Sequence, residues 1–168
     1  MGNSRGEPDA VETQLFSGEV LTDADRETLF GQYRMFAETS EALVARRQGV
    51  NTFFLSVNSA IIAVVGLLLR DGESADLESA MILGLGLVGV ALCSVWRRLI
   101  KSFGQLNTAK FAVILEIEKR LPARMFAAEW ASLEHGYASF TETESRTAGV
   151  FAVLQTLLVA AGIWLLCG

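Results

Sequence analysis

Uncharged apolar residues are gathered into three long blocks along the chain. The blocks are 52–69, 80–96 and 148–167; they hold 18, 17 and 20 residues, and none of them contains Asp, Glu, Lys, Arg or His. A helix needs roughly 20 such residues to cross a hydrocarbon core about 30 Å thick. The pattern therefore predicts an all-α membrane protein with transmembrane helices at 52–69, 80–96 and 148–167. The alternative, a soluble all-α protein, would have too little polar surface to cover these blocks.

Amphipathic segments precede the first block and follow the second. Apolar residues recur at helical spacing through 23–51, which predicts an amphipathic helix that continues into the first span. After the second block the same spacing continues until Pro122, which lacks a backbone donor. We therefore expect one helix over 80–121, about 63 Å long at about 1.5 Å per residue. Its outer half and the rest of 97–147 are expected to form a cytoplasmic helical bundle with 23–51.

The remaining segments are short. We expect residues 1–22, which are acidic and polar, to form a disordered arm, and 70–79 to form a short extracytoplasmic loop. A further short helix is expected over 123–133. Helix starts are predicted by capping boxes at two places, where Thr22 precedes Asp25 and Ser139 precedes Glu142 by three residues.

The basic residues predict the orientation in the membrane. Of the 14 Lys and Arg, 13 lie before the first block or between the second and third, and Arg70 alone lies in the 70–79 loop. Lys and Arg accumulate on the cytoplasmic side of membrane proteins, so we expect a cytoplasmic N-terminus and an extracytoplasmic C-terminus. Trp96 and Trp164 are expected in the headgroup zone. The residues expected to contact lipid headgroups are Arg46, Arg47, Arg97 and Arg98.

Composition argues against several functions. The net charge of −5 gives no basic footprint for nucleic acid. One His and two Cys cannot supply a zinc finger or a disulfide framework. Glu116 and Arg120 are expected to form an ordinary (i, i+4) surface pair, and His135 a solvated side chain. We expect no catalytic residues, no metal and no cofactor, and therefore no enzyme; a membrane enzyme would need an activity that Glu129→Gln abolishes.

Small residues occur at regular intervals in the spans. Gly84, Gly86 and Gly89 match the dinucleotide fingerprint, but that motif requires a preceding strand, and here it lies within a predicted span. Close helix packing is the favoured interpretation for Gly86 and Gly89, with simple filler as the alternative. In the third span the small residues recur every four positions, at Ala148, Ala152, Thr156 and Ala160.

Four polar residues lie at membrane depth: Asn58, Ser59, Gln155 and Thr156. Such residues usually face protein or water rather than lipid. Interhelical hydrogen bonds that fix assembly are the favoured interpretation, and the lining of a water-filled path is the alternative. Cys167 ends the third span and would be unpaired outside the cell, where it could bridge two chains.

Two stretches of the sequence resemble a known family. The first contains Arg46-Arg47-Gln48, Asn51, Phe53-Phe54-Leu55-Ser56 and Asn58; the second contains Leu106-Asn107, Lys110-Phe111, Ile114, Glu116-Ile117-Glu118, Leu121-Pro122, Phe126 and Glu129-Trp130. In these motifs the chain resembles the RipA-type octameric small integral membrane proteins of bacteria. The resemblance covers Tyr33 to Trp130 closely and the third span in outline. It implies a bacterial inner-membrane protein that forms a homo-octamer with a cytoplasmic helical part, and it supplies no activity.

These features favour a non-enzymatic membrane scaffold or stress-adaptation component that contacts itself, the bilayer and an unidentified cytoplasmic protein. The alternative is an oligomeric channel or membrane-permeabilising effector with Asn58 or Thr156 facing its axis. Lys110, Glu129 and Trp130 are expected either between subunits or within the bundle of one chain. The candidate residues for helix packing or for the oligomer interface are Asn58, Ser59, Gly86, Gly89, Ala152, Thr156, Ala160, Lys110, Glu129 and Trp130.

Overall fold

Every regular element that the structure describes is a helix. The computed structural model describes residues 7–16, 22–71, 75–133 and 140–167. The helices are α1 (Glu7–Leu15), α2 (Asp23–Asp71), α3 (Ala75–Glu118), α4 (Met125–Leu133) and α5 (Phe140–Cys167). Three of them, α2, α3 and α5, are long and apolar enough to cross a membrane. The predicted all-α membrane fold is confirmed.

The chain divides into two compact units. Unit 1 comprises Met1–Ala45 and Gly104–Tyr137, and unit 2 comprises Arg46–Phe103 and Ala138–Gly168. Helices α2 and α3 contribute residues to both units, because each continues without a break from its amphipathic segment through its apolar block. This continuity is as the sequence predicts.

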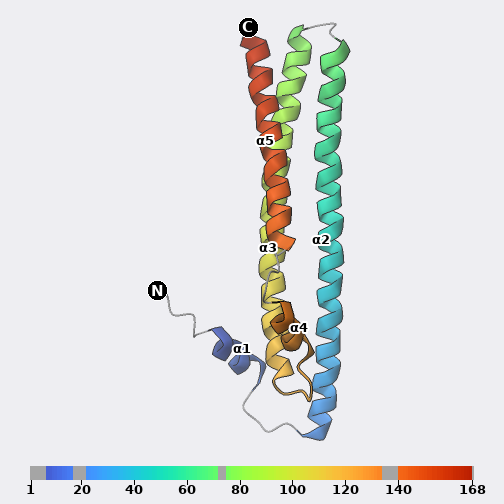
Figure 1. Cartoon of the computed structure of the whole chain (residues 1–168), viewed down its shortest axis with the longest axis vertical. Coiled ribbons are helices and arrows are strands. Elements are labelled where there is room, and N and C mark those ends of the chain that lie inside the picture. The colour runs from blue at the N-terminus through green and yellow to red at the C-terminus, as the bar shows by residue number, and fades with distance from the viewer. Residues whose placement is uncertain (1–6, 17–21, 72–74, 134–139, 168) are drawn as a thin grey trace. The chain divides into compact units, whose positions relative to one another are not determined.

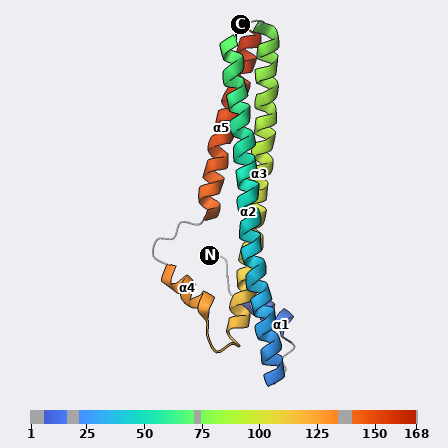
Figure 2. The same cartoon turned by 90° about the vertical axis from the view of Figure 1, so that its right-hand side faces the viewer.

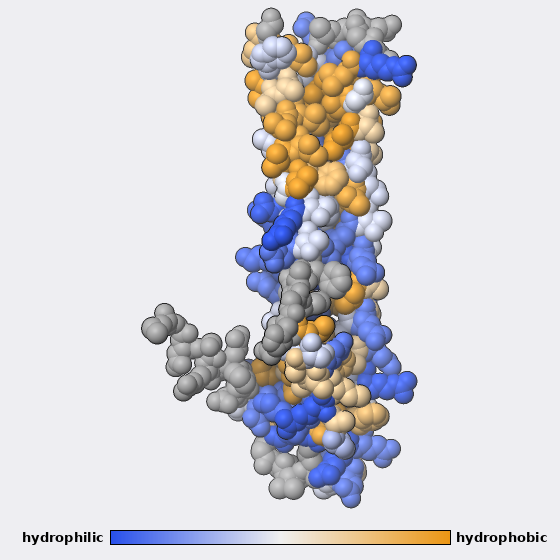
Figure 3. Space-filling view, in the orientation of Figure 1, coloured by the Kyte–Doolittle hydropathy of each residue, from blue (hydrophilic) through white to orange (hydrophobic). Residues whose placement is uncertain are grey.

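Unit 2 contains the three span segments, and α5 lies along α3 in both views (Figures 1 and 2). Hydrogen bonds also connect α5 with α2. Its core cluster is formed by Phe54, Trp96, Ile100 and Ala148. The rings of Phe54 and Trp96 are stacked, with centroids 5.8 Å apart. Hydrophobic residues also cover the outer surface of the spans on the face drawn in Figure 3. Only 22%, 33% and 11% of the most apolar stretches of α2, α3 and α5 are buried within the chain, so most of their apolar surface remains open to lipid or to other chains.

Unit 1 has a separate core. Leu29 and Tyr33 of α2 pack with Ile114 and Ile117 of α3, and Phe126 of α4 packs against this group. The amphipathic spacing of 23–51 and 97–121 thus buries one stripe of each helix, as expected for a helical bundle.

Helix α3 ends earlier than the sequence predicts. Its last residue is Glu118, three positions before Leu121. The chain then forms tighter turns in which the amides of Lys119 and Arg120 donate to the carbonyls of Glu116 and Ile117. The α conformation is disfavoured in the residue before a proline, so Pro122 affects the chain ahead of its own position.

The N-terminal arm differs from the expected disorder at 7–15, where the structure has helix α1. The reason is a set of contacts at its end. Phe16 packs against the unit 1 core, and the guanidinium of Arg120 lies 3.7 Å from the centroid of its ring. Arg120 also pairs with Glu12 at 3.2 Å.

The capping box at the start of α2 is confirmed. The amide of Thr22 donates to Oδ2 of Asp25 at 2.8 Å, and the amide of Asp25 donates to Oγ1 of Thr22 at 3.3 Å. Hydrogen bonds from the side chain and then the backbone of Thr22 lower the pKa of Asp25. The second predicted box, at Ser139, lies outside the described residues, as does His135.

Candidate functional site

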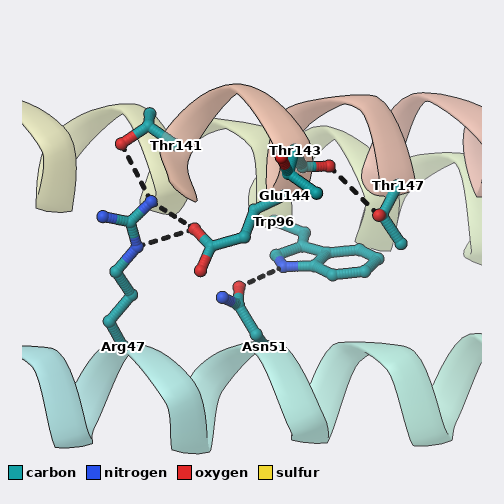
Figure 4. Close-up of polar contacts among 7 residues, drawn as sticks. All are labelled: Arg47, Asn51, Trp96, Thr141, Thr143, Glu144 and Thr147. Atoms are coloured by element: carbon teal, nitrogen blue, oxygen red, sulfur yellow. Dashed lines mark hydrogen bonds and ion pairs between the residues drawn. The ribbon is translucent and has the colours of Figure 1, made fainter. Parts of the chain in front are cut away.

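A polar cluster lies beside the apolar span segments in unit 2 and connects α2, α3 and α5 (Figure 4). We call it the interfacial cluster; it consists of Arg47, Asn51, Trp96, Thr141 and Glu144. The Nε of Arg47 donates to Oε2 of Glu144 at 2.6 Å. The Nη2 of Arg47 pairs with the same carboxylate oxygen and donates to Oγ1 of Thr141 at 2.9 Å. The indole Nε1 of Trp96 donates to Oδ1 of Asn51 at 2.8 Å.

This cluster corrects one sequence expectation. Arg47 does not extend toward headgroups; its side chain is 12% exposed and paired with Glu144, which is 21% exposed. Trp96 is only 2% exposed, whereas Trp164 is 73% exposed. An arginine beside an apolar block can meet a carboxylate from a distant helix as well as a phosphate, and spacing in the sequence does not separate the two cases.

A second polar group, the span cluster, lies among the apolar segments and consists of Asn58, Cys93 and Gln155. Oδ1 of Asn58 accepts from Sγ of Cys93 at 3.2 Å and from Nε2 of Gln155 at 3.3 Å. Nδ2 of Asn58 donates to the carbonyl of Phe54 at 2.8 Å. All three cluster members are fully buried. These interhelical hydrogen bonds lie within one chain, whereas the sequence prediction was of bonds that fix assembly. They bury Asn58 inside the chain rather than on a face that could line an axis between copies.

Two of the predicted packing glycines touch α5 directly. A Cβ on Gly89 would lie 2.2 Å from Cδ of Gln155, and one on Gly86 would lie 2.9 Å from the backbone nitrogen of Val159. Gly84 has nothing within 4 Å of such a Cβ. The interpretation of Gly86 and Gly89 as helix-packing positions is therefore supported within the chain.

The small-residue stripe on α5 is mostly not used for packing within the chain. Ala148 is buried, but Thr156 and Ala160 are exposed and Ala152 is half-buried. The buried side of α5 instead carries Ala148, Gln155 and Gly162, seven residues apart. Thr156 donates its hydroxyl to the carbonyl of Ala152 at 2.8 Å.

Unit 1 contains a third group, the capping cluster, which sequence reasoning missed. It consists of Tyr33, Glu118 and the amides of Phe126 and Ala127. Oε1 of Glu118 accepts from the Tyr33 hydroxyl at 2.7 Å and from the Phe126 amide at 2.8 Å; Oε2 accepts from the Ala127 amide at 3.0 Å. The carboxylate of Glu118 is fully buried and supplies acceptors for the free amides at the start of α4.

Burial, the hydrogen bond to Glu118 and the charge of Glu118 raise the pKa of Tyr33. The phenol therefore stays protonated and remains a donor. The signal available in the sequence was the glutamate shortly before a Leu-Pro break and a new short helix, an arrangement in which one acid can cap the next helix.

The other predicted residues of unit 1 fall into two groups. Lys110 bonds within the chain, donating to Oγ1 of Thr39 at 2.8 Å. Glu116 pairs with Lys119 at 2.6 Å and not with Arg120, so the predicted surface pair is wrong. Glu129 and Trp130 are exposed on α4.

The remaining predicted residues lie on the surface of unit 2. Ser59, Arg46, Arg97 and Arg98 are all exposed. Within 7–16, 22–71, 75–133 and 140–167, no group of three or more His, Cys, Asp or Glu is placed to hold a metal ion.

Comparison with known proteins finds a family. Residues 30–164 match the family model of the octameric membrane protein family (8xMP), which includes both the unit 1 and unit 2 segments described above. No curated protein and no solved structure matches the chain.

Proposed function

Because the chain belongs to the octameric membrane protein family, we propose that it is a non-enzymatic membrane scaffold. Eight copies associate through their span helices, and the helical unit 1 engages an unidentified cytoplasmic protein, in a role such as adaptation to stress. The proposed location is the inner membrane of a bacterium.

The observation that carries the proposal is the uncovered surface of α5. Only 11% of its most apolar stretch is buried within the chain. Val153, Leu157 and Trp164 are each more than half exposed. Small residues allow close approach of helices in lipid, so the stripe of Ala152, Thr156 and Ala160 supports contact with a neighbouring copy.

A partner for unit 1 is supported by apolar side chains outside the span segments. Phe30, Met35 and Val44 of α2 and Met125 and Trp130 of α4 are all about half exposed or more. Lipid does not account for them if unit 1 lies outside the bilayer. Aromatic residues and methionine are enriched at protein contact surfaces relative to the rest of a protein surface.

The scaffold is favoured over a channel because the span cluster directs its polar groups into the chain. Of the four polar residues at membrane depth, Asn58 and Gln155 bond to each other between α2 and α5, and only Ser59 and Thr156 are exposed. Thr156 is exposed, but its hydroxyl already bonds to its own helix. A water-filled path would need polar groups aimed outward from the chain.

Native mass spectrometry of the mildly solubilised protein tests the assembly. The expected result is one species of eight copies, and Ala160→Leu should shift it to smaller species. Ala91→Leu, at an exposed alanine of α3, is the matched control. Monomeric wild-type protein would overturn the proposal. Equal loss of the eight-copy species in both variants would show that α5 does not have the role proposed for it.

A liposome flux assay then separates scaffold from channel. Reconstituted octamers are expected to leave the vesicles tight. Ion flux that Thr156→Val abolishes while the octamer stays intact would instead establish the channel.

The proposed topology, with the N-terminus in the cytoplasm and the C-terminus outside, is tested through the cysteines. Cys167 is exposed and Cys93 is buried, so a membrane-impermeant maleimide applied to intact cells should label the wild type and not Cys167→Ser. Labelling only after permeabilisation would reverse the topology. Non-reducing electrophoresis of the same samples tests whether Cys167 bridges two chains.

A further inference from the structure

One end of the span segments in unit 2 carries cations that have no acidic partner. Arg97, Arg98 and Lys101 of α3 and Arg46 of α2 are exposed. In the part of the chain that the structure describes, none of the four forms an ion pair or a hydrogen bond through its side chain. Arg47, their neighbour on α2, is by contrast engaged by Glu144.

The carboxylates of α5 at this end of the spans already pair with other cations. On α5, Glu142 pairs with Arg146 at 2.6 Å, and Glu144 pairs with Arg47. Helix α3 has no acid between Glu78 and Glu116. The positive charge of the four cations is therefore not neutralised by a neighbouring carboxylate.

The three cations of α3 lie on one side of the helix. Arg97 and Lys101 are four residues apart, and Arg98 and Lys101 are three apart, so their side chains are neighbours on the helix surface. Like charges at these spacings destabilise a helix. An anion bound among them would remove that repulsion, and a guanidinium can hold a phosphate through two parallel hydrogen bonds.

The position along the chain indicates which anion. Trp96 ends the uncharged block 80–96, and the cations follow at once. Side chains at the end of a membrane span meet the headgroup phosphates of the bilayer. We propose that Arg97, Arg98 and Lys101 form a binding site for the headgroup of an anionic phospholipid, with Arg46 adding positive charge at the same end of the spans.

The test measures lipid binding to the full-length protein, and native mass spectrometry in detergent is the readout. Phosphatidylglycerol and phosphatidylcholine are titrated separately, because both carry the phosphate and only the first carries a net negative charge. Wild-type protein should bind phosphatidylglycerol more tightly. In the triple variant Arg97→Gln, Arg98→Gln, Lys101→Gln, the preference should fall by roughly fivefold for each cation removed.

A charge-matched control uses three exposed cations of unit 1, in the variant Arg26→Gln, Arg34→Gln, Arg124→Gln. It should keep the lipid preference. Wild-type protein without a preference, a triple variant that keeps it, or a control that loses it equally would each overturn the proposal. Displacement of phosphatidylglycerol by an equal concentration of inorganic phosphate would identify a free anion as the ligand and also overturn it.

The site does not depend on the scaffold proposal. The same spectra report the number of protein copies and the number of bound lipids as separate masses. Loss of lipid preference with eight copies retained, or the reverse, therefore distinguishes a failure of one proposal from a failure of the other.

Discussion

The hydroxyl of Tyr33 donates a 2.7 Å hydrogen bond to Oε1 of Glu118, although the two residues are 85 positions apart in the chain. The same carboxylate accepts the amides of Phe126 and Ala127. One buried acid thus joins α2, the end of α3 and the start of α4. A buried charge that loses its donors has neither water nor a partner, so the packing of unit 1 depends on this arrangement.

Glu118→Gln should loosen α4. Glutamine keeps the shape of the side chain but removes its charge. Its NH2 group replaces one of the two oxygens that accept the amides of Phe126 and Ala127, so a donor would face a donor. We expect a loss of about 3 kcal/mol in the free energy of unfolding, because hydrogen bonds to a charged group are among the stronger ones. Hydrogen exchange of peptides covering 125–133 measures the loss as reduced protection of the α4 amides. Glu38→Gln, at an exposed (i, i+4) pair with Arg34, is the control, and equal protection of α4 in both variants would contradict the capping role.

The raised pKa of Tyr33 predicts a loss of stability at alkaline pH. The folded-state pKa lies above the ordinary value of 10.0. The contribution to stability is therefore complete below that ordinary value and is lost as pH rises toward the folded-state pKa. Thermal unfolding from about pH 9 to about pH 11 should show a decline in the wild type that Tyr33→Phe reduces. The same slope in both proteins would assign the decline to other groups.

Gly89→Ala should destabilise the packing of α3 on α5. The added Cβ would lie 2.2 Å from Cδ of Gln155, so the carboxamide must move. Overpacking of this kind typically costs about 1–3 kcal/mol. Gly84→Ala is the matched control on the same helix, since nothing lies within 4 Å of its Cβ. Thermal unfolding in detergent compares the two variants, and an unchanged midpoint for Gly89→Ala would mean that Gln155 has another position to occupy.

The hydrogen bond between Asn58 and Gln155 can be tested by a double-mutant cycle. Asn58→Leu should cost stability because it leaves Nε2 of Gln155 buried without its acceptor. Adding Gln155→Leu should recover part of the loss, since removing both partners leaves no unpaired polar group at this contact. The coupling energy is expected to be about 0.6–1.7 kcal/mol, as for polar pairs in membrane helices. Additive losses in the unfolding free energy would show that the two side chains act independently.

Arg47→Gln should be far more costly than Arg146→Gln. The first leaves Glu144, 21% exposed, without its cation, and we expect a loss of about 3 kcal/mol. The second breaks a pair whose side chains are 78% and 60% exposed, which is worth about 1 kcal/mol or less. Each variant removes one positive charge shortly before a span, Arg47 before 52–69 and Arg146 before 148–167. Similar unfolding midpoints for the two would indicate that burial of the Arg47 pair has little energetic effect.

The membrane character of the chain follows from its sequence alone. Three uncharged blocks of span length can satisfy their backbone groups in lipid only as helices or closed barrels, and no strand pattern occurs. The capping box at Thr22 and the continuity of α2 were likewise predictable, because both depend on neighbours a few residues apart. The end of α3 was predicted three residues too late, since Pro122 acts on the residue ahead of it.

The partners of the polar side chains were decided only by the tertiary structure. Arg47 and Glu144 are 97 positions apart, and Tyr33 and Glu118 are 85 apart. Periodicity shows which face of a helix is apolar, but it does not show which residue of another helix lies opposite. That depends on the rotation and axial shift of each helix, which the packing of large side chains such as Trp96 on Phe54 sets. The sequence by itself therefore determined the helices and their apolar faces, and the packing of those helices decided which charges are paired and which remain free.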